Sequence, residues 1–365
     1  MSLNSTLLMR IQYAQQYYFI PPMLKNFSME ALSLLEKLVK IESSSGREER
    51  LASFILDYLH SLKYGAFMEG ANVLVFPERD FIIASHMDTF KVLSTFSSDD
   101  EYAYGTGVCD AKASIAAILL ALKKITVEKI NFGVVFFHDE EGEGIGSKEY
   151  CKTYRPSMAV VMEPTNMTIA NVQYGGLELK IRVMGRAAHG AFPEMGENAI
   201  EKCMDVIRKL LGVKRVKVSA QYIRGGSPED FVIPDECEAR IEIFFKPNLK
   251  VEDVLSRVKR ILGSRDLELI VKDAYSGFMS NKTPMLLKEA MKSLGYKVKF
   301  SEMPSWTDAI NLHEMAGCDV AIFGPGELYS CHTRGERVKI KDVIAAADIL
   351  VALNNLLAKK RSHLK

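Results

Sequence analysis

Seven histidine and acidic residues follow short apolar runs of the chain or precede a helical pattern. They are His86, Asp88, Asp110, Glu140, Glu141, Glu163 and His332. In open α/β sheets, ligand sites lie beyond the carboxyl ends of the strands. If the apolar runs are neighbouring strands, these side chains gather at one edge of one sheet. Clustered carboxylates need a cation to offset their repulsion, and two imidazoles with several carboxylates form a ligand set for zinc and related divalent metals.

The chemistry of such a site follows from its carboxylates. Asp110 is placed to bridge two ions, so two metals are the natural count. Two ions about 3.5 to 4 Å apart polarise a carbonyl and hold a water of lowered pKa. A carboxylate that is not a ligand is then needed as general base, and the adjacent Glu140 and Glu141 offer one base and one ligand. The set predicts hydrolysis of an amide, peptide or similar acyl bond.

Each of these residues also has a purely structural explanation. A lone histidine is more often a hydrogen-bonded structural residue than a ligand, and an aspartate before a helix is usually an N-cap. An acidic run is usually a solvated face. The coincidence of four or more such positions at one predicted sheet edge is what favours a metal site.

The apolar runs have the length of buried strands. They occupy residues 72–76, 81–85, 132–137, 158–162 and 318–323. Most lack alternation, and helical patterns lie between them, including two amphipathic helices within residues 29–63. This pattern indicates an α/β catalytic domain with a largely parallel sheet and helices on both faces.

The order of elements changes in the middle of the chain. From about residue 175 to 273 the pattern is β-α-β-β-α-β, which is typical of a small split-βαβ sandwich. The Gly175-Gly176 and Ser276-Gly277 pairs are expected as hinges at its ends. We therefore expect a catalytic domain interrupted by an inserted α+β domain. The expected divisions are an N-terminal extension (1–28), a first catalytic part (29–174), the inserted domain (175–275) and a second catalytic part (276–365).

The amino-acid composition argues against some classes of binding partner. The 365 residues include 47 Lys and Arg against 46 Asp and Glu, for a net charge of +1. This balance argues against nucleic acid or an anionic membrane as the main partner, and no apolar run reaches the roughly 18 to 20 residues of a membrane span. Six scattered cysteines, without a Cys-x-x-Cys pair, fit a reducing, cytoplasmic compartment.

With these motifs the chain resembles the co-catalytic zinc exopeptidase and deacylase family. That family contains acetylornithine deacetylase, succinyl-diaminopimelate desuccinylase, acetyl-lysine deacetylase and glutamate carboxypeptidase. The resemblance spans residues 29–356 in order. It rests on residues 85–89, 105–112, 138–141, 163–164, 324–326 and 331–332. It covers the inserted domain too, which in this family is a lid that often dimerises, so a homodimer through the lid is expected.

The resemblance implies a set of metal ligands. One metal would be held by His86 and Glu163 and another by Glu141 and His332, with Asp110 bridging them. Zinc is the expected metal, and cobalt is a possible substitute.

Three further residues receive roles by resemblance. Asp88 would orient and polarise the imidazole of His86, and Glu140 would act as general base. The lid segment at residues 185–190 is similar to one whose histidine reaches an active site, often that of the partner subunit, and stabilises the tetrahedral oxyanion. That histidine is His189.

The chain departs from the family pattern at three positions. Ala113 stands where a glycine is usual. Phe231 and Phe244 align with a lid asparagine and arginine that contact substrate carboxylates in the desuccinylase, so a diacid substrate is less expected.

The expected function is release of lysine or ornithine from an N-acylated form, either acetylated or joined to an amino-group carrier protein, in lysine or arginine biosynthesis. The segment at residues 304–309 and the short loop between His86 and Asp110 look most like that branch. A dipeptidase or carboxypeptidase of the same family is the alternative. A non-catalytic regulatory protein on the same fold would show gaps in the ligand set, and the sequence has none.

Overall fold

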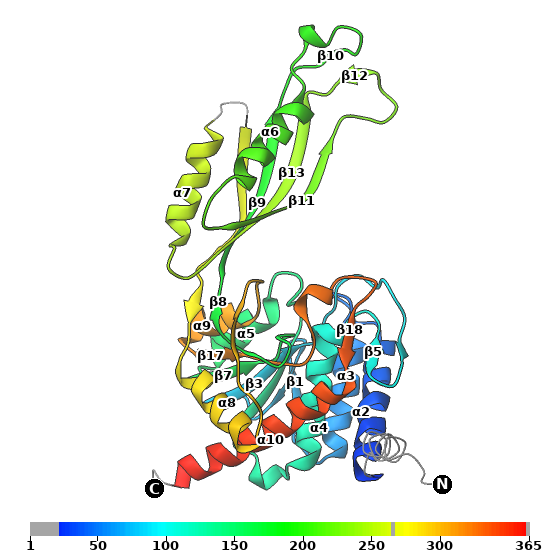
Figure 1. Cartoon of the computed structure of the whole chain (residues 1–365), viewed down its shortest axis with the longest axis vertical. Helices are drawn as coiled ribbons and strands as arrows, with labels where there is room; N and C mark the ends of the chain where they lie inside the picture. The colour runs from blue at the N-terminus through cyan, green and yellow to red at the C-terminus, as the bar shows by residue number, and fades with distance from the viewer. Residues whose placement is uncertain (1–21, 264–266, 363–365) are drawn as a thin grey trace, which may run out of the picture.

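The computed structural model describes residues 22–263 and 267–362. Two bodies are visible in Figure 1, a sheet covered by helices and an elongated domain that projects from it. Helix α2 (Pro22–Lys40) begins inside the stretch expected as an N-terminal extension. The first 21 residues of that stretch lie outside the described residues.

The larger body is built on a nine-stranded sheet. Its strands, in spatial order, are β1 (Phe67–Glu69), β2 (Asn72–Val75), β6 (Gly133–Phe137), β3 (Phe81–His86), β7 (Met158–Val161), β17 (Asp319–Ile322), β8 (Ile169–Gln173) and β15 (Phe278–Met279), with β16 (Phe300–Met303) also paired to β8. The four central strands β6, β3, β7 and β17 run parallel. Strands β2 and β8 flank them in antiparallel pairings. The largely parallel sheet predicted from the apolar runs is confirmed.

Helices cover both faces of this sheet and bury its central strands on both sides. They are α2, α3 (Glu49–Ser61), α4 (Ala113–Lys124), α8 (Lys282–Ser293) and α10 (Ile340–Ser362) on one face and α5 (Ile145–Thr153) and α9 (Ala309–Ala316) on the other. The neighbouring residues Ile82 and Ile83 point to opposite faces and belong to different core clusters.

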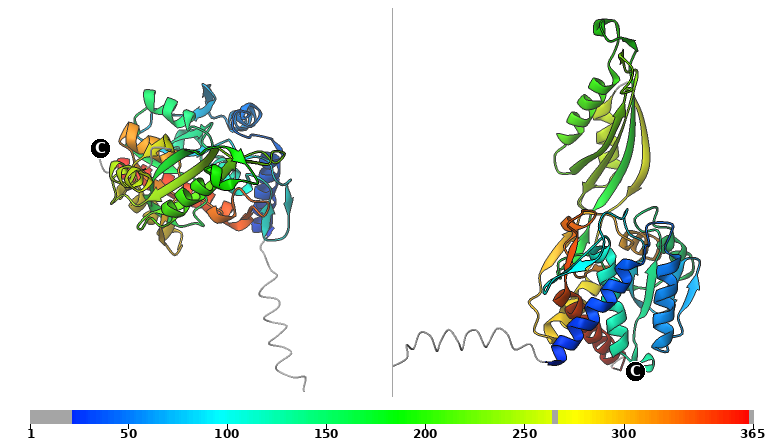
Figure 2. Two further views of the ribbon diagram at one scale, coloured as in Figure 1. Left: turned by 90° about the horizontal axis from the view of Figure 1, so that it is seen from above. Right: turned by 90° about the vertical axis from the view of Figure 1, so that its right-hand side faces the viewer.

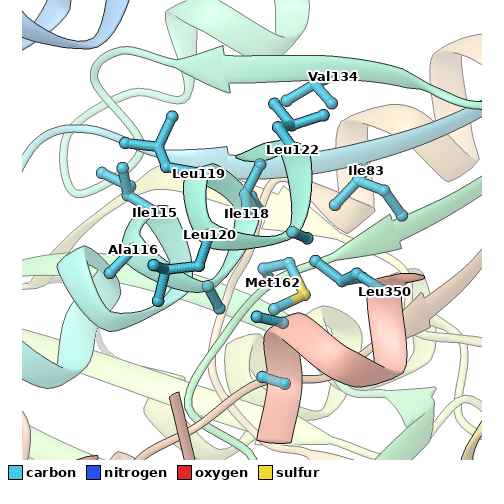
Figure 3. Close-up of a cluster of buried hydrophobic side chains, with 14 of the residues drawn as sticks. Ile83, Ile115, Ala116, Ile118, Leu119, Leu120, Leu122, Val134, Met162 and Leu350 are labelled. Carbon is cyan, nitrogen blue, oxygen red and sulfur yellow. The ribbon is translucent and has the colours of Figure 1, made fainter. Parts of the chain in front are cut away.

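Helix α4 is apolar all round because it is packed between other elements on every side. Residues 113–122 are all buried. Figure 3 shows Ile115, Ile118 and Leu122 of this helix packed among Ile83 of the sheet and Leu350 of α10. Within the described parts of the chain, no helix is both long and apolar enough to cross a membrane.

The projecting domain is the predicted split-βαβ lid. Its antiparallel sheet has the order β11 (Lys217–Gly225), β13 (Glu236–Phe245), β9 (Gly175–Met184) and β14 (Leu267–Tyr275). Helices α6 (Ala199–Leu211) and α7 (Val251–Leu262) pack on it through a separate apolar core. A small ribbon of β10 (Ala188–His189) and β12 (Val232–Ile233) lies at the end of the lid farthest from the larger sheet (Figures 1 and 2).

The glycines expected as a hinge are closely packed in the structure. Gly175 and Gly176 are the buried first residues of strand β9. A Cβ atom on Gly176 would lie 2.3 Å from the hydroxyl of Tyr275, and one on Gly175 would lie 2.6 Å from the ring of Phe245. These positions therefore need glycine for close strand packing.

A polar cluster around Glu302 of the larger body lies beside these glycines, and one of its contacts reaches the lid. The Tyr174 hydroxyl donates to Glu302 Oε2 at 2.6 Å, and Lys246 Nζ of the lid lies 2.7 Å from Glu302 Oε1. The Lys246–Glu302 ion pair thus crosses the junction between the lid and the larger body.

Candidate metal centre

Adjacent parallel strands bring the predicted residues together. His86 is the last residue of β3, Glu140 and Glu141 follow β6, and Glu163 follows β7. His332 lies in the loop between β17 and β18 (Arg337–Lys339). Because β6, β3, β7 and β17 are neighbours that run in one direction, their carboxyl ends share one edge of the sheet.

Asp110 lies between the two histidines. It belongs to the tight turn η1 (Val108–Lys112), which leads into α4. Its Oδ1 atom lies 3.1 Å from His86 Nε2, and its Oδ2 atom lies 3.5 Å from His332 Nε2. The two oxygens of one carboxylate therefore face two different imidazoles.

Two groups of donor atoms share Asp110. One contains His86 and Glu163, and the other contains Glu141 and His332; within each group the donor atoms lie within 4.8 Å of one another. The Nε2 atom of His86 is 3.7 Å from Glu163 Oε2, and that of His332 is 2.7 Å from Glu141 Oε1. All are buried or nearly so except His332, whose side chain is 44% exposed.

Glu140 lies beside these groups without belonging to either. Its Oε2 atom is 4.0 Å from His86 Nε2, and its side chain is 9% exposed. Burial raises the pKa of Glu140 well above its ordinary value, and the charge of Glu163 adds to the rise. A buried carboxyl of this kind is suited to accept and return a proton.

Asp88 makes contacts that the sequence did not predict. His86 Nδ1 donates to the main-chain oxygen of Asp88 at 2.9 Å, while the carboxylate oxygen Oδ1 is 3.4 Å away. The carboxylate instead accepts bonds from the backbone N–H groups of Glu140 and Glu141, both at 2.9 Å, and from the Ser45 hydroxyl at 2.8 Å. Asp88 therefore holds the Glu140–Glu141 turn, and its main chain fixes the His86 tautomer that leaves Nε2 free to bind a metal.

His332 is oriented from its other side by an aromatic ring. Phe90 stacks on its imidazole with ring centroids 4.9 Å apart and an interplanar angle of 15°. The backbone of His332 has a φ of +59°, a left-handed conformation that is uncommon outside glycine. Ring stacking and backbone together aim Nε2 at Asp110 and Glu141.

The cluster contains more acidic groups than basic ones, and this imbalance shifts the pKa values of its members. Burial raises the pKa of Glu163 to about 8. Hydrogen bonds to Asp110 and Glu141 raise the pKa of His332 to about 10. Burial opposes ionisation of Asp110, but hydrogen bonds from His332 and His86 hold its pKa below its ordinary value. Without a cation, the cluster therefore retains protons that isolated side chains would lose near neutral pH.

The cluster also passes a test of fit for divalent ions. Glu163 Oε1 is buried and has no hydrogen-bond partner among the described residues. A buried carboxylate oxygen without a partner is costly. Two imidazoles and three carboxylates arranged around one shared aspartate match the ligand types that zinc prefers. These residues fit a pair of metal ions.

Two buried acids beside the cluster were missed by sequence reasoning. Asp308 begins α9 and is fully buried, and burial raises its pKa to about 7. Glu336 is 2% exposed and accepts hydrogen bonds from the turn that carries Asp110. Neither residue directly follows a buried strand run. The local sequence therefore does not distinguish these two acids from acids exposed to solvent.

His189 is the predicted residue that the structure does not bring to the cluster. It lies in β10 at the tip of the lid, away from the larger sheet (Figures 1 and 2). Its side chain is exposed, and its Nδ1 atom accepts a hydrogen bond from Ala191 N at 3.1 Å. Within a single chain it makes no contact with the metal-ligand candidates in the described residues.

A two-histidine, three-carboxylate cluster at the edge of a parallel sheet, under a split-βαβ lid, defines the chain as a candidate metallohydrolase. Residues 82–355 match the family model for peptidase family M20/M25/M40, and the chain belongs to this hydrolase family.

Similar proteins cover nearly the whole chain. The LysW-lysine/LysW-ornithine hydrolase of Sulfurisphaera tokodaii is 23% identical over 339 residues, which cover 90% of this chain and 96% of that protein. The succinyl-diaminopimelate desuccinylase of Corynebacterium glutamicum is 26% identical over 352 residues, covering 88% and 95%. The fold is similar to that of a tripeptidase from Staphylococcus aureus, with a TM-score of 0.77, 21% identity, and coverage of 91% and 99%.

Proposed function

We propose that the protein is a metal-dependent amide hydrolase that releases lysine or ornithine from an N-acylated form. The acyl group is acetyl or an amino-group carrier protein, and the reaction belongs to lysine or arginine biosynthesis. The observation that supports hydrolysis best is Asp110, whose two oxygens face two histidine–carboxylate groups, one of them buried.

Two divalent ions, zinc or alternatively cobalt, would complete the site. His86 and Glu163 would hold one ion, Glu141 and His332 the other, and Asp110 would bridge them. When bound, the ions supply Lewis acidity that polarises a carbonyl and lowers the pKa of water. The raised pKa values of Glu163 and His332 support this assignment, because they show where the folded chain lacks positive charge.

Glu140 is the proposed general base. It lies beside the ligand groups without joining them, and Asp88 fixes the backbone of its turn. It takes a proton from the attacking water and returns it to the nitrogen of the leaving amine. Its buried position excludes bulk water from this transfer.

His189 is proposed to stabilise the oxyanion in the site of a second copy. Its exposed position at the lid tip supports action on another surface. Strand β11 is an end strand of the lid sheet, and its Tyr222 and Ile223 side chains are 43% and 47% exposed. Such an edge can pair with its symmetry mate. We therefore propose a homodimer formed through the lid.

The free thiols support a reducing, cytoplasmic setting for the enzyme. All six cysteines are buried, and no disulfide joins any two of them. Stable disulfides are rare in that compartment.

Two residues of the lid favour a substrate that releases a basic amino acid over a substrate with a second carboxylate. The positions aligned with two substrate-carboxylate contacts of the desuccinylases hold Phe231 and Phe244, which cannot bind a second carboxylate. Phe231 is 90% exposed, and its main-chain oxygen accepts a hydrogen bond from Gly190 N, next to His189. These two phenylalanines therefore support a lysine or ornithine product in the proposal.

A substrate panel with metal analysis tests the proposal. Acetyl-lysine, acetyl-ornithine, a carrier-protein–lysine conjugate, succinyl-diaminopimelate and dipeptides are each incubated with zinc-loaded protein, and Glu140→Ala is the blank. We expect release of lysine or ornithine and about two metal ions per chain. Turnover of dipeptides alone would favour the dipeptidase alternative, and loaded protein that hydrolyses nothing would favour the non-catalytic one.

A further inference from the structure

Glu336 is buried against the turn that carries Asp110. Its Oε2 atom accepts a hydrogen bond from Gly107 N at 3.0 Å, and its Oε1 atom accepts bonds from Cys109 N at 2.9 Å and Asp110 N at 3.1 Å. Its main-chain oxygen also accepts a bond from Gly105 N at 3.3 Å. One residue therefore receives four backbone N–H groups of residues 105–110.

The shape of the turn explains why these donors need a carboxylate. Gly107 has a φ of +76°, and Asp110 departs from helical geometry, so successive N–H groups point to one side. Converging N–H groups of this kind form an anion-binding concavity. Buried N–H groups left without acceptors would destabilise the turn. Glu336 fills the concavity from within the same chain.

The same residue is close in sequence to the second histidine. Glu336 follows His332 by four positions, and its N–H donates to the Thr333 main-chain oxygen at 3.3 Å. It thereby joins the turn of His332 to the turn of Asp110. These two side chains meet at 3.5 Å between His332 Nε2 and Asp110 Oδ2.

Building on the proposed metal site, we propose that Glu336 is a positioning residue that sets the distance between the bridging carboxylate of Asp110 and the imidazole of His332. It touches neither substrate nor ion. Its effect passes through the backbone of the two turns, and it acts most strongly on the ion held by Glu141 and His332.

Asp319 offers a matched control. Its carboxylate also accepts three backbone N–H groups, those of Asn281, Lys282 and Thr283 at the start of α8. It begins strand β17, at the end of the strand opposite the metal centre. Asp319→Asn therefore weakens a similar set of bonds without touching either ligand turn.

The experiment measures zinc binding to the full chain by calorimetric titration for wild type, Glu336→Gln, Glu336→Ala and Asp319→Asn. Glu336→Ala should raise the dissociation constant of the more weakly bound ion about 10- to 100-fold, with a smaller change for Glu336→Gln. Asp319→Asn should lower the melting temperature and leave both zinc affinities at the wild-type values. Wild-type zinc affinities in both Glu336 variants, or equal weakening by Asp319→Asn, would overturn the proposal.

This readout is independent of the substrate. If wild type binds two ions but cleaves none of the panel substrates, the proposed function is contradicted while the zinc affinities still decide the role of Glu336. Steady-state measurement of kcat and KM on an active substrate adds a second readout. A positioning role lowers kcat in the Glu336 variants at saturating zinc, whereas Asp319→Asn leaves kcat unchanged.

Discussion

The sheet edge and the lid tip both contribute residues to the proposed reaction, but the residues at the sheet edge are buried and hydrogen-bonded whereas those at the lid tip are exposed. At the sheet edge, Asp88 and Glu336 each accept several hydrogen bonds and lie fully or almost fully buried. At the lid tip, His189 is exposed, and Phe192 and Phe231 beside it are 58% and 90% exposed. The ligand cluster is thus organised within one chain, whereas His189 lies apart from it on an exposed ribbon.

The comparison predicts its largest effect at the sheet edge. Glu140→Ala should lower kcat by about 10²- to 10⁴-fold, because it removes the proton acceptor. Zinc content should not change, since Glu140 is in neither ligand group. Metal analysis beside steady-state kinetics checks both statements. The exposed neighbour Glu143 is the control, and Glu143→Ala should keep wild-type kcat. A Glu140→Ala protein that retains activity would remove Glu140 from the role of base.

The lid tip should give the next largest effect. His189→Ala should lower kcat by about 10²- to 10³-fold with unchanged zinc content, because an oxyanion donor is lost. If His189 serves the site of a partner, a hybrid of one Glu140→Ala chain and one His189→Ala chain contains one complete site. Such hybrids, purified through two affinity tags, should show about half the wild-type activity per dimer. Inactive hybrids would place His189 at the site of its own chain, and a His189→Ala homodimer with wild-type kcat would remove His189 from the reaction.

A smaller effect is expected from the hydrogen bonds that organise the sheet edge. Asp88→Asn leaves one acceptor oxygen for the N–H groups of Glu140 and Glu141, so the turn loosens. We expect kcat to fall about 10- to 100-fold, the range typical of residues that support metal ligands. Ser45→Ala removes a single donor to the same carboxylate and should change kcat far less. Equal losses in both variants would show that the turn does not depend on the Asp88 charge.

The same contrast explains what the sequence could predict. The apolar runs predict the strands of the sheet, because buried strands leave a local sequence pattern. The residues that follow those runs are His86, Glu140, Glu141 and Glu163, and they are predicted by the rule that ligand sites lie at strand carboxyl ends. Contacts between segments far apart in the sequence leave no such local pattern. Gly107 and Glu336 are 229 residues apart, and no local pattern joins them.

The glycine pair at the start of the lid shows the same limit. Gly175 and Gly176 have the sequence signature of a hinge, yet the structure packs them against Phe245 and Tyr275. Glycine serves both flexible turns and close backbone approach. Only the tertiary neighbours decide between the two.

The smallest predicted effect concerns pH and the metal-free sheet edge. Burial raises the pKa of Glu163 from 4.5 to about 8, and its acidic neighbours raise that of His332 from 6.5 to about 10. A group with a raised folded-state pKa stabilises the fold fully below its unfolded pKa and loses that contribution as pH rises through the folded value. The stabilisation from Glu163 is therefore present below pH 4.5 and lost by pH 8, and that from His332 declines between pH 6.5 and 10.

Chelator-treated protein should accordingly lose stability as pH rises from about 6 to about 8.5, while zinc-loaded protein should not, because the ions replace the protons and bind more tightly to deprotonated ligands. The gap between the two melting temperatures should widen by a few degrees over this range, at about 2 to 4 °C per kcal/mol. Differential scanning calorimetry at several pH values measures it. Glu163→Gln, which cannot ionise, should reduce the widening, and Glu143→Gln at the exposed edge should leave it intact. A constant gap in the wild type would mean that the buried carboxylates are not the groups that zinc relieves.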